Sequence, residues 1–427
     1  MNINDFKNFV FGATDPTTAV GLITEQLLSM GFAQFSETDH WEKVNKDAKG
    51  IFVVRDNSII AVRLPEKLER FNGTLTHLDS PCFKIKHNMV FEQNGYTKLN
   101  VEPYGGAIFY SWLDKPLAIS GTVITSQYEE IYINTGNENQ VFIPSQAIHI
   151  NPEVNKQNTL NPVKDMSPCT ILRPGQEFKD CICDLVREIT DDTILTMDLA
   201  LYNPEEVKEV CFGEGKTMLM GPRLDNLASV YAALSAFAES EINQEIASVF
   251  VAFDGEEIGS NIYSGAGGNF LTSVLERVCN LYGVDKYATF AKSDFLSIDA
   301  AHALHPNAPE KSDASNIVEM GKGLVIKHNA NYAKDLIVEA YIEDVCHMSG
   351  IGHQHFYSRS DMRCGSTLGN ISMAQTGIRT LDIGIPMLGM HSSVETICKD
   401  DLEALENFLS IYYTDWEKGP NKGLFAT

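Results

Sequence analysis

The sequence predicts an α/β fold with a β-rich module inserted into it. Three observations support this prediction. Helical patterns alternate with buried-strand patterns after residue 221, and a stretch of short β-rich runs precedes them. The chain has 427 residues, which exceeds the roughly 250 to 300 residues that a single hydrophobic core usually serves. We therefore expect a main α/β domain and a second module.

The first third of the chain contains the beginning of the main domain and the beginning of an inserted module. Residues 19–28 have a helical pattern, and short strands at 51–54 and 59–63 lead towards His77. From about residue 86 to about 216, short β-rich runs alternate with Gly, Asn and Pro, which is typical of an inserted β-rich module. We expect the main domain to comprise residues 1–87 and 215–427, and the insertion to comprise residues 88–214.

The later part of the chain has the pattern of a parallel sheet covered on both faces. The expected elements are, in order, a helix, a strand, a helix and a strand, at 227–238, 246–253, 270–281 and 295–298. Carboxylates follow the two strands directly. Because ligands bind at the carboxyl ends of strands in open α/β sheets, we expect a functional site there.

Composition narrows the range of partners. The formal net charge is −24, from 33 basic and 57 acidic residues, which opposes binding to nucleic acid or an anionic membrane and favours cations. No run approaches the roughly 20 apolar residues of a membrane span, and the N-terminus lacks a signal-peptide pattern. The nine cysteines show no paired spacing. We expect a reduced protein of the cytoplasm.

Several residues match the needs of a divalent-metal hydrolase, which uses imidazoles, carboxylates and one further carboxylate as a proton shuttle. His77 precedes Asp79 by two positions, so Asp79 could orient the imidazole. Glu256 and Glu257 are adjacent at a strand end, where they repel each other unless a cation or a proton intervenes. A solvated acidic turn is the alternative for this pair. The presence of other candidate ligands in the sequence favours the metal site. Those candidates are Asp225, Asp299 and His391.

Other motifs carry less weight. Neither His-Glu-x-x-His nor Gly-x-Ser-x-Gly occurs, which weakens the single-zinc protease and serine-hydrolase interpretations. Cys346, His347, His353 and His355 follow no familiar zinc-finger spacing, and we interpret these histidines as core or pocket residues rather than a zinc cluster.

Eight ordered motifs resemble the aspartyl aminopeptidase and vacuolar aminopeptidase I family of dinuclear metallopeptidases. The resemblance covers essentially the whole chain. The matching segments are 77–86, 143–149, 222–229, 254–260, 299–307, 325–330, 361–367 and 389–392. Two positions depart from the family pattern, because Gly255 and Ser145 stand where histidine is usual or frequent.

The resemblance implies a zinc-peptidase-like α/β/α sandwich with a central mixed sheet and an inserted domain for dimerisation or as a lid. It implies two Zn²⁺ ions per subunit, with Co²⁺ or Mn²⁺ as possible replacements. One ion would be held by His391, Glu257 and a bridging Asp225. The other would be held by His77, Asp299 and the same Asp225.

The resemblance also implies roles around the ions. Glu256 would be the general base, and His302, Lys327 and His149 would contact substrate, with Lys327 meeting an acidic N-terminal side chain and His149 reaching a neighbouring subunit's site. The substrates would be peptides, and the assembly a homo-oligomer, expected as a dodecamer built from dimers. A same-fold deacylase and a catalytically silent oligomeric scaffold are the competing interpretations.

Overall fold

The computed structural model describes residues 1–41, 44, 49–156, 159–172, 176–187, 189–190 and 192–414. The last part of the expected main domain, residues 415–427, lies outside the described residues. Among the helices in the described ranges, none combines the length and the apolar character needed to span a membrane.

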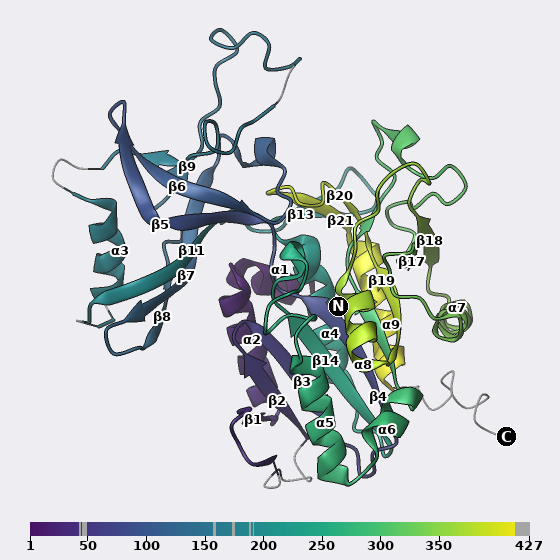
Figure 1. Cartoon of the computed structure of the whole chain (residues 1–427). Helices are drawn as coiled ribbons and strands as arrows, with labels where there is room; N and C mark the ends of the chain where they lie inside the picture. Colours follow the sequence, from purple (N-terminus) through teal and green to yellow (C-terminus); the bar gives the residue numbers. More distant parts are fainter. Residues whose placement is uncertain are drawn as a thin grey trace.

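A nine-stranded mixed sheet forms the centre of the main domain (Figure 1). Four neighbouring strands in its middle are parallel to one another. The strand directly next to this group on each side runs antiparallel to it. The order across the sheet is β1 (Ala33–Phe35), β2 (Gly50–Arg55), β3 (Ser58–Arg63), β14 (Ile246–Phe253), β4 (Arg70–His77), β15 (Asp294–Ile298), β19 (Arg379–Gly384), β17 (Leu324–His328) and β18 (His353–Tyr357). The expected α/β fold with a central mixed sheet is confirmed.

Helices cover both faces of this sheet because its central strands are apolar on both sides. Along β14, Phe250 and Ala252 join one hydrophobic cluster, whereas Val249 and Val251 join the other. The first cluster packs under α1 (Ile3–Gly12), α2 (Pro16–Ser29), α4 (Leu224–Glu239), α7 (Leu336–Ser349) and α9 (Lys399–Thr414). The second packs under α5 (Phe270–Tyr282), α6 (Lys286–Lys292) and α8 (Leu368–Thr376). The main domain is therefore a three-layer α/β/α sandwich.

A second sheet, with its own hydrophobic core, stands beside the main domain (Figure 1). Its order is β11 (Ile194–Tyr202), β5 (Cys82–Gln93), β6 (Tyr96–Tyr104), β10 (Cys169–Thr170), β9 (Val141–Phe142), β7 (Pro116–Thr125) and β8 (Glu130–Asn134). Its core also takes in three apolar side chains of α3 (Phe178–Arg187). These elements lie between Cys82 and Tyr202, and the division of the chain at residues 88 and 214 stays a prediction.

This second sheet closes on itself, because β11 pairs with β7 as well as with β5. Gly121 lies at the closing pair, with a φ of +147° and the carbonyl oxygen of Asp198 where a Cβ atom would stand. Only glycine allows the two backbones to approach in this way. Closure removes two edges that would otherwise expose unpaired backbone groups.

A small third sheet connects the two parts of the molecule. It consists of β12 (Lys208–Val210), β13 (Met218–Gly221), β21 (Glu395–Cys398), β20 (Pro386–Leu388) and β16 (Ala301–His302). Figure 1 shows β13, β20 and β21 between the central sheet and the β-rich part. The turn between β20 and β21 contains His391, and β16 contains His302. Short 3₁₀ helices occur at Phe109–Trp112, Glu256–Ile258 and Pro309–Lys311.

Candidate metal centre

The five predicted metal ligands lie at the ends of neighbouring elements. His77 is the last residue of β4, and Asp299 directly follows β15. Glu257 lies in the 3₁₀ helix that follows β14, and Asp225 is the second residue of α4. His391 lies in the turn after β20. Because β14, β4 and β15 are parallel neighbours, their carboxyl ends meet at one edge of the sheet.

The ligand atoms form two groups that share Asp225. His77 Nε2 lies 3.6 Å from Asp225 Oδ1 and 3.5 Å from Asp299 Oδ1. His391 Nε2 lies 3.6 Å from Asp225 Oδ2 and 3.4 Å from Glu257 Oε2. In each group the three ligand atoms lie within 4.8 Å of one another. Each oxygen of the Asp225 carboxylate therefore faces a different histidine and carboxylate.

The residues present fit divalent cations. Oδ1 of Asp225 and Oε1 of Glu257 are buried without a hydrogen-bond partner, a costly state for an oxygen unless an ion engages it. Burial raises the pKa of Glu257 well above its usual range, and the nearby Asp225 raises it further. Without a cation, the carboxyl of Glu257 therefore holds its proton to a higher pH than usual, whereas a bound cation would keep it ionised. Imidazole nitrogens and carboxylate oxygens are suitable donors for zinc.

Asp79 holds several parts of the site in place. Its carboxylate accepts the backbone N–H groups of Glu256 and Glu257, each at 3.0 Å, and the hydroxyl of Tyr104 at 2.8 Å. Nδ1 of His77 lies 3.0 Å from the backbone carbonyl oxygen of Asp79 and 3.5 Å from its carboxylate. Donation from Nδ1–H to this carbonyl leaves the Nε2 lone pair of His77 free for a metal ion.

Glu395, which is not among the residues predicted from the sequence, supports the centre. This buried carboxylate accepts the N–H of Asp225 at 2.8 Å through Oε2 and the N–H of His391 at 2.7 Å through Oε1. Burial raises its pKa well above the usual range, with the charge of Asp225 as a second cause. Glu395 begins the short strand β21, three positions after the motif at 389–392, and the pairing of β21 with β13 in the third sheet brings it to Asp225.

Lys327 lies on β17 and contacts the centre from within the protein. Only 2% of its side chain is exposed, and Nζ lies 3.2 Å from Asp299 Oδ2 and 2.9 Å from the carbonyl oxygen of Ala300. Burial alone would raise the pKa of Asp299, but Lys327 and His77 together hold it below its usual range. In this arrangement the ammonium group neutralises a predicted metal ligand.

The remaining predicted residues lie at different depths. Glu256 is half-buried, with a side-chain oxygen grouped with His77 and Glu257, and burial raises its pKa to about 8. His302 is exposed on β16, and its ring contacts the ring of Phe356 edge to face. His149 is exposed in a turn of the β-rich part, and within the described residues it belongs to none of the ligand groups.

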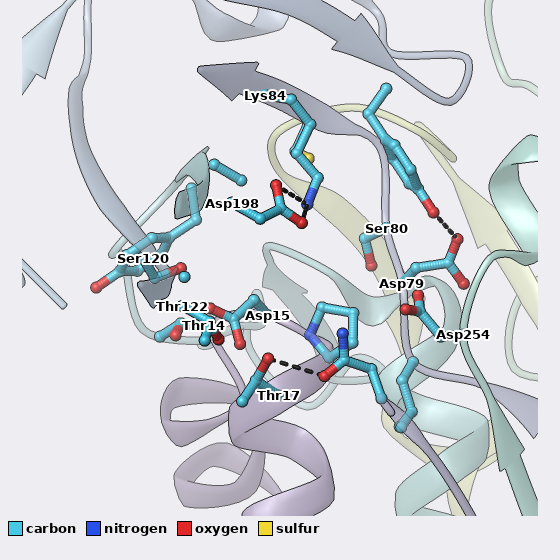
Figure 2. A pocket seen from close by; sticks show the side chains of 18 of the residues that line it. Thr14, Asp15, Thr17, Asp79, Ser80, Lys84, Ser120, Thr122, Asp198 and Asp254 are labelled. Carbon is cyan, nitrogen blue, oxygen red and sulfur yellow. Dashed lines mark hydrogen bonds and ion pairs between the residues drawn. The ribbon is translucent and has the colours of Figure 1, made fainter. Parts of the chain in front are cut away.

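A cavity of about 770 Å³ lies behind the centre, between the main domain and the β-rich part. Figure 2 shows Asp79 and Asp254 on one side and the Lys84–Asp198 ion pair on the other. Asp79 and Glu395 line the cavity, but the five predicted ligands are not among its described lining residues. The cavity therefore borders the groups that support the centre, rather than the face where the ligand atoms converge.

Comparisons with known proteins agree along the length of the chain. Residues 9–413 match the family model of the aminopeptidase I zinc metalloproteases (M18). A probable M18 family aminopeptidase 2 of Clostridium acetobutylicum is 35% identical, with 92% of this chain and 93% of that protein covered. A probable M18 family aminopeptidase 2 of Pseudomonas aeruginosa is 34% identical, with 96% and 97% covered.

Solved structures agree as well. A chain in the cryo-EM structure of the Ape4 and Nbr1 complex has a TM-score of 0.88 at 32% identity, with 96% of this chain and 85% of that chain covered. The mApe1 dodecamer of S. cerevisiae matches with a TM-score of 0.85 at 22% identity, covering 99% and 98%, and supports the fold alone. The comparisons favour neither the deacylase nor the scaffold interpretation. The chain belongs to the M18 family of zinc metalloproteases and is a metal-dependent aminopeptidase.

Proposed function

We propose that this aminopeptidase uses two divalent cations per subunit, with Asp225 as the residue that both ions share. Zinc is the expected metal for both positions. The two Asp225 oxygens, facing His77 and His391 at 3.6 Å each, are the observation that supports this proposal most directly. Glu257 completes the group around His391, and Asp299 completes the group around His77. A single ion in the His77 group would leave the carboxylate of Glu257 without a cation.

The reaction is hydrolysis of the first peptide bond of a substrate. The two cations supply Lewis acidity for the carbonyl and make the attacking water more acidic. Glu256 accepts a proton from that water as its oxygen attacks the carbonyl carbon, and then donates the proton to the departing amine as the C–N bond breaks. Asp79 keeps Glu256 in place through the backbone N–H at 3.0 Å. His302, exposed on β16, hydrogen-bonds the oxyanion or the substrate.

The proposed substrates are peptides, with a preference for Asp or Glu as the first residue. Lys327 is the cation assigned to that preference, although its Nζ is already 3.2 Å from Asp299. A substrate carboxylate would therefore share Lys327 with Asp299. Rates on Asp-, Glu- and Leu-headed substrates test this assignment. Loss of the acidic preference in Lys327→Ala supports it, whereas an unchanged preference contradicts it.

We further propose a homo-oligomer of twelve subunits in the cytoplasm, in which His149 reaches a neighbouring active site. The S. cerevisiae relative named above is a dodecamer. In this chain, Ile148 and Ile150 flank His149, and 46% and 78% of their surfaces are exposed. Apolar side chains exposed at such a turn are suited to burial against another subunit. A solution mass of twelve times the 47.3 kDa chain supports this assembly, and a monomer contradicts it.

Replacement of Asp225 tests the two-metal proposal. Asp225→Ala should lose two metal ions per chain relative to wild type, because each Asp225 oxygen belongs to one ligand group. Turnover of aminoacyl substrates should fall to background. Elemental analysis after dialysis and a chromogenic assay measure both effects. Asp5→Ala, which removes an exposed carboxylate from α1, is the control and should change neither quantity. Loss of only one ion in Asp225→Ala contradicts the shared role.

A further inference from the structure

A second cluster of candidate metal-ligand side chains lies at one lateral edge of the central sheet. His328 is the last residue of β17, and His355 lies in β18, the edge strand. In the parallel register, His355 pairs with Ile326 and Tyr357 pairs with His328, so the two histidines project from the same face of the sheet. Helix α7 packs over this face and contributes Glu339 (Figure 1).

The ligand atoms of this cluster converge. His328 Nε2 lies 2.9 Å from His355 Nδ1 and 3.7 Å from Glu339 Oε1, and the three residues offer ligand atoms within 4.8 Å of one another. The ring of His328 is held in place by stacking on Tyr357, with a centroid distance of 4.5 Å and an interplanar angle of 5°. The imidazole of His328 therefore has a defined orientation towards the other two residues.

A fourth side chain orients His355. Nε2 of His355 lies 3.4 Å from Oε1 of Glu343. Glu343 follows Glu339 by one helical turn on α7. Metal-binding histidines usually donate their second ring N–H to a carboxylate in this manner, and the donation leaves the other nitrogen free to bind the ion. With Nε2–H directed at Glu343, the lone pair of Nδ1 is directed at His328 and Glu339.

The chemistry of the cluster favours an ion over a hydrogen bond between the two imidazoles alone. Such a hydrogen bond accounts for the 2.9 Å contact but leaves Oε2 of Glu339 buried without a partner.

We propose that His328, His355 and Glu339 bind a divalent transition-metal ion of the zinc class, at a site separate from the aminopeptidase centre. Two imidazoles and one carboxylate select zinc, cobalt or nickel over magnesium and calcium, which prefer oxygen ligands alone. Three protein ligands leave one tetrahedral position for water. The ion ties α7 to the edge of the sheet at β17 and β18. This proposal does not depend on the number of ions in the aminopeptidase centre.

The first test counts ions. Wild type and His355→Gln are loaded with Zn²⁺, dialysed and analysed for metal per chain. His355 is suited to replacement because 34% of its side chain is exposed. His355→Gln should hold one ion fewer than wild type and keep its turnover. The matched control is His353→Gln, on the same strand but outside the ligand group, and it should keep the full count. Equal counts in wild type and His355→Gln overturn the proposal.

The second test isolates the site. In Asp225→Ala the aminopeptidase centre is disabled, so Zn²⁺ should raise the melting temperature of this variant through the His328 cluster alone. The rise should disappear in the double variant Asp225→Ala/His355→Gln and persist in Asp225→Ala/His353→Gln. A rise that persists without His355 overturns the assignment. Loss of turnover in His355→Gln together with its ion would place that ion in the aminopeptidase centre and also overturn it. The ion count does not require Asp225→Ala to fold.

Discussion

The aminopeptidase centre and the His328 cluster both lie at strands of one sheet, but they differ in charge. The centre combines two imidazoles with the carboxylates of Asp225, Glu257 and Asp299, and Glu256 adds a fourth carboxyl group beside them. The His328 cluster combines two imidazoles with one carboxylate, and Glu343 lies outside the ligand group. An excess of buried carboxylates needs more than one cation, whereas two neutral imidazoles and one carboxylate need one.

The two regions also differ in how their ligands are supported. In the aminopeptidase centre, the buried carboxylates of Asp79 and Glu395 each accept two backbone N–H groups, so the turns that contain the ligands are held in place. In the His328 cluster, the support consists of a ring stack and a partly exposed glutamate. A reactive centre needs fixed geometry, whereas the ion proposed at the His328 cluster would only join two elements of the fold.

The largest effect is expected in the aminopeptidase centre, at the carboxyl group that is not a predicted metal ligand. Glu256→Gln removes the proposed proton acceptor but leaves every predicted ligand, so turnover should fall by about 10²- to 10⁴-fold while the metal content stays at the wild-type level. Steady-state kinetics and elemental analysis on one preparation measure both quantities. Glu257→Gln is the contrasting variant and should lose metal as well. Turnover of Glu256→Gln within tenfold of wild type would remove Glu256 from the mechanism.

A smaller effect is expected where the two regions meet. Lys327 is adjacent to His328 on β17, and its ammonium group pairs with Asp299 in the other region. Lys327→Met leaves the largely buried Asp299 carboxylate without its cation, so the metal-free protein should lose about 3–5 kcal/mol of unfolding free energy. Urea denaturation in chelator and in Zn²⁺ measures this loss. Bound zinc should reduce it, and an equal loss in both conditions would show that Lys327 does not balance the charge of Asp299.

The smallest effect is expected at the support of the centre. Glu395→Gln keeps the shape of the side chain but replaces one accepting oxygen with an NH₂ group, so one backbone bond to Asp225 or His391 is lost. Zinc affinity should fall by about 10- to 100-fold, as competition with a chelator would measure. The control is Glu406→Gln, a buried glutamate of α9 that faces the N-terminal ammonium at 3.1 Å. If both variants bind zinc equally, Glu395 has only a general structural role.

Much of the fold followed from local pattern. The apolar run at 246–253 is buried along its whole length as β14, and the helix expected at 227–238 lies within α4. The helix expected at 19–28 lies within α2, which begins with Pro16 after an Asp15–Thr18 capping box. Such features depend on neighbours in the sequence. Among the short β-rich runs of the insertion, β9 pairs over two residues only, and this limit depends on distant partners.

The sequence by itself determined the α/β class and the candidate ligands, because carboxylates directly after buried strands must lie at one edge of a parallel sheet. Only the tertiary structure decided what surrounds them. Glu395 reaches Asp225 across 170 positions through the pairing of β13 with β21. Residues 328 and 355 meet because β17 lies parallel to β18, and α7 then brings position 339 over them. Contacts of this kind depend on strand order and register, which local hydrophobic patterns do not specify.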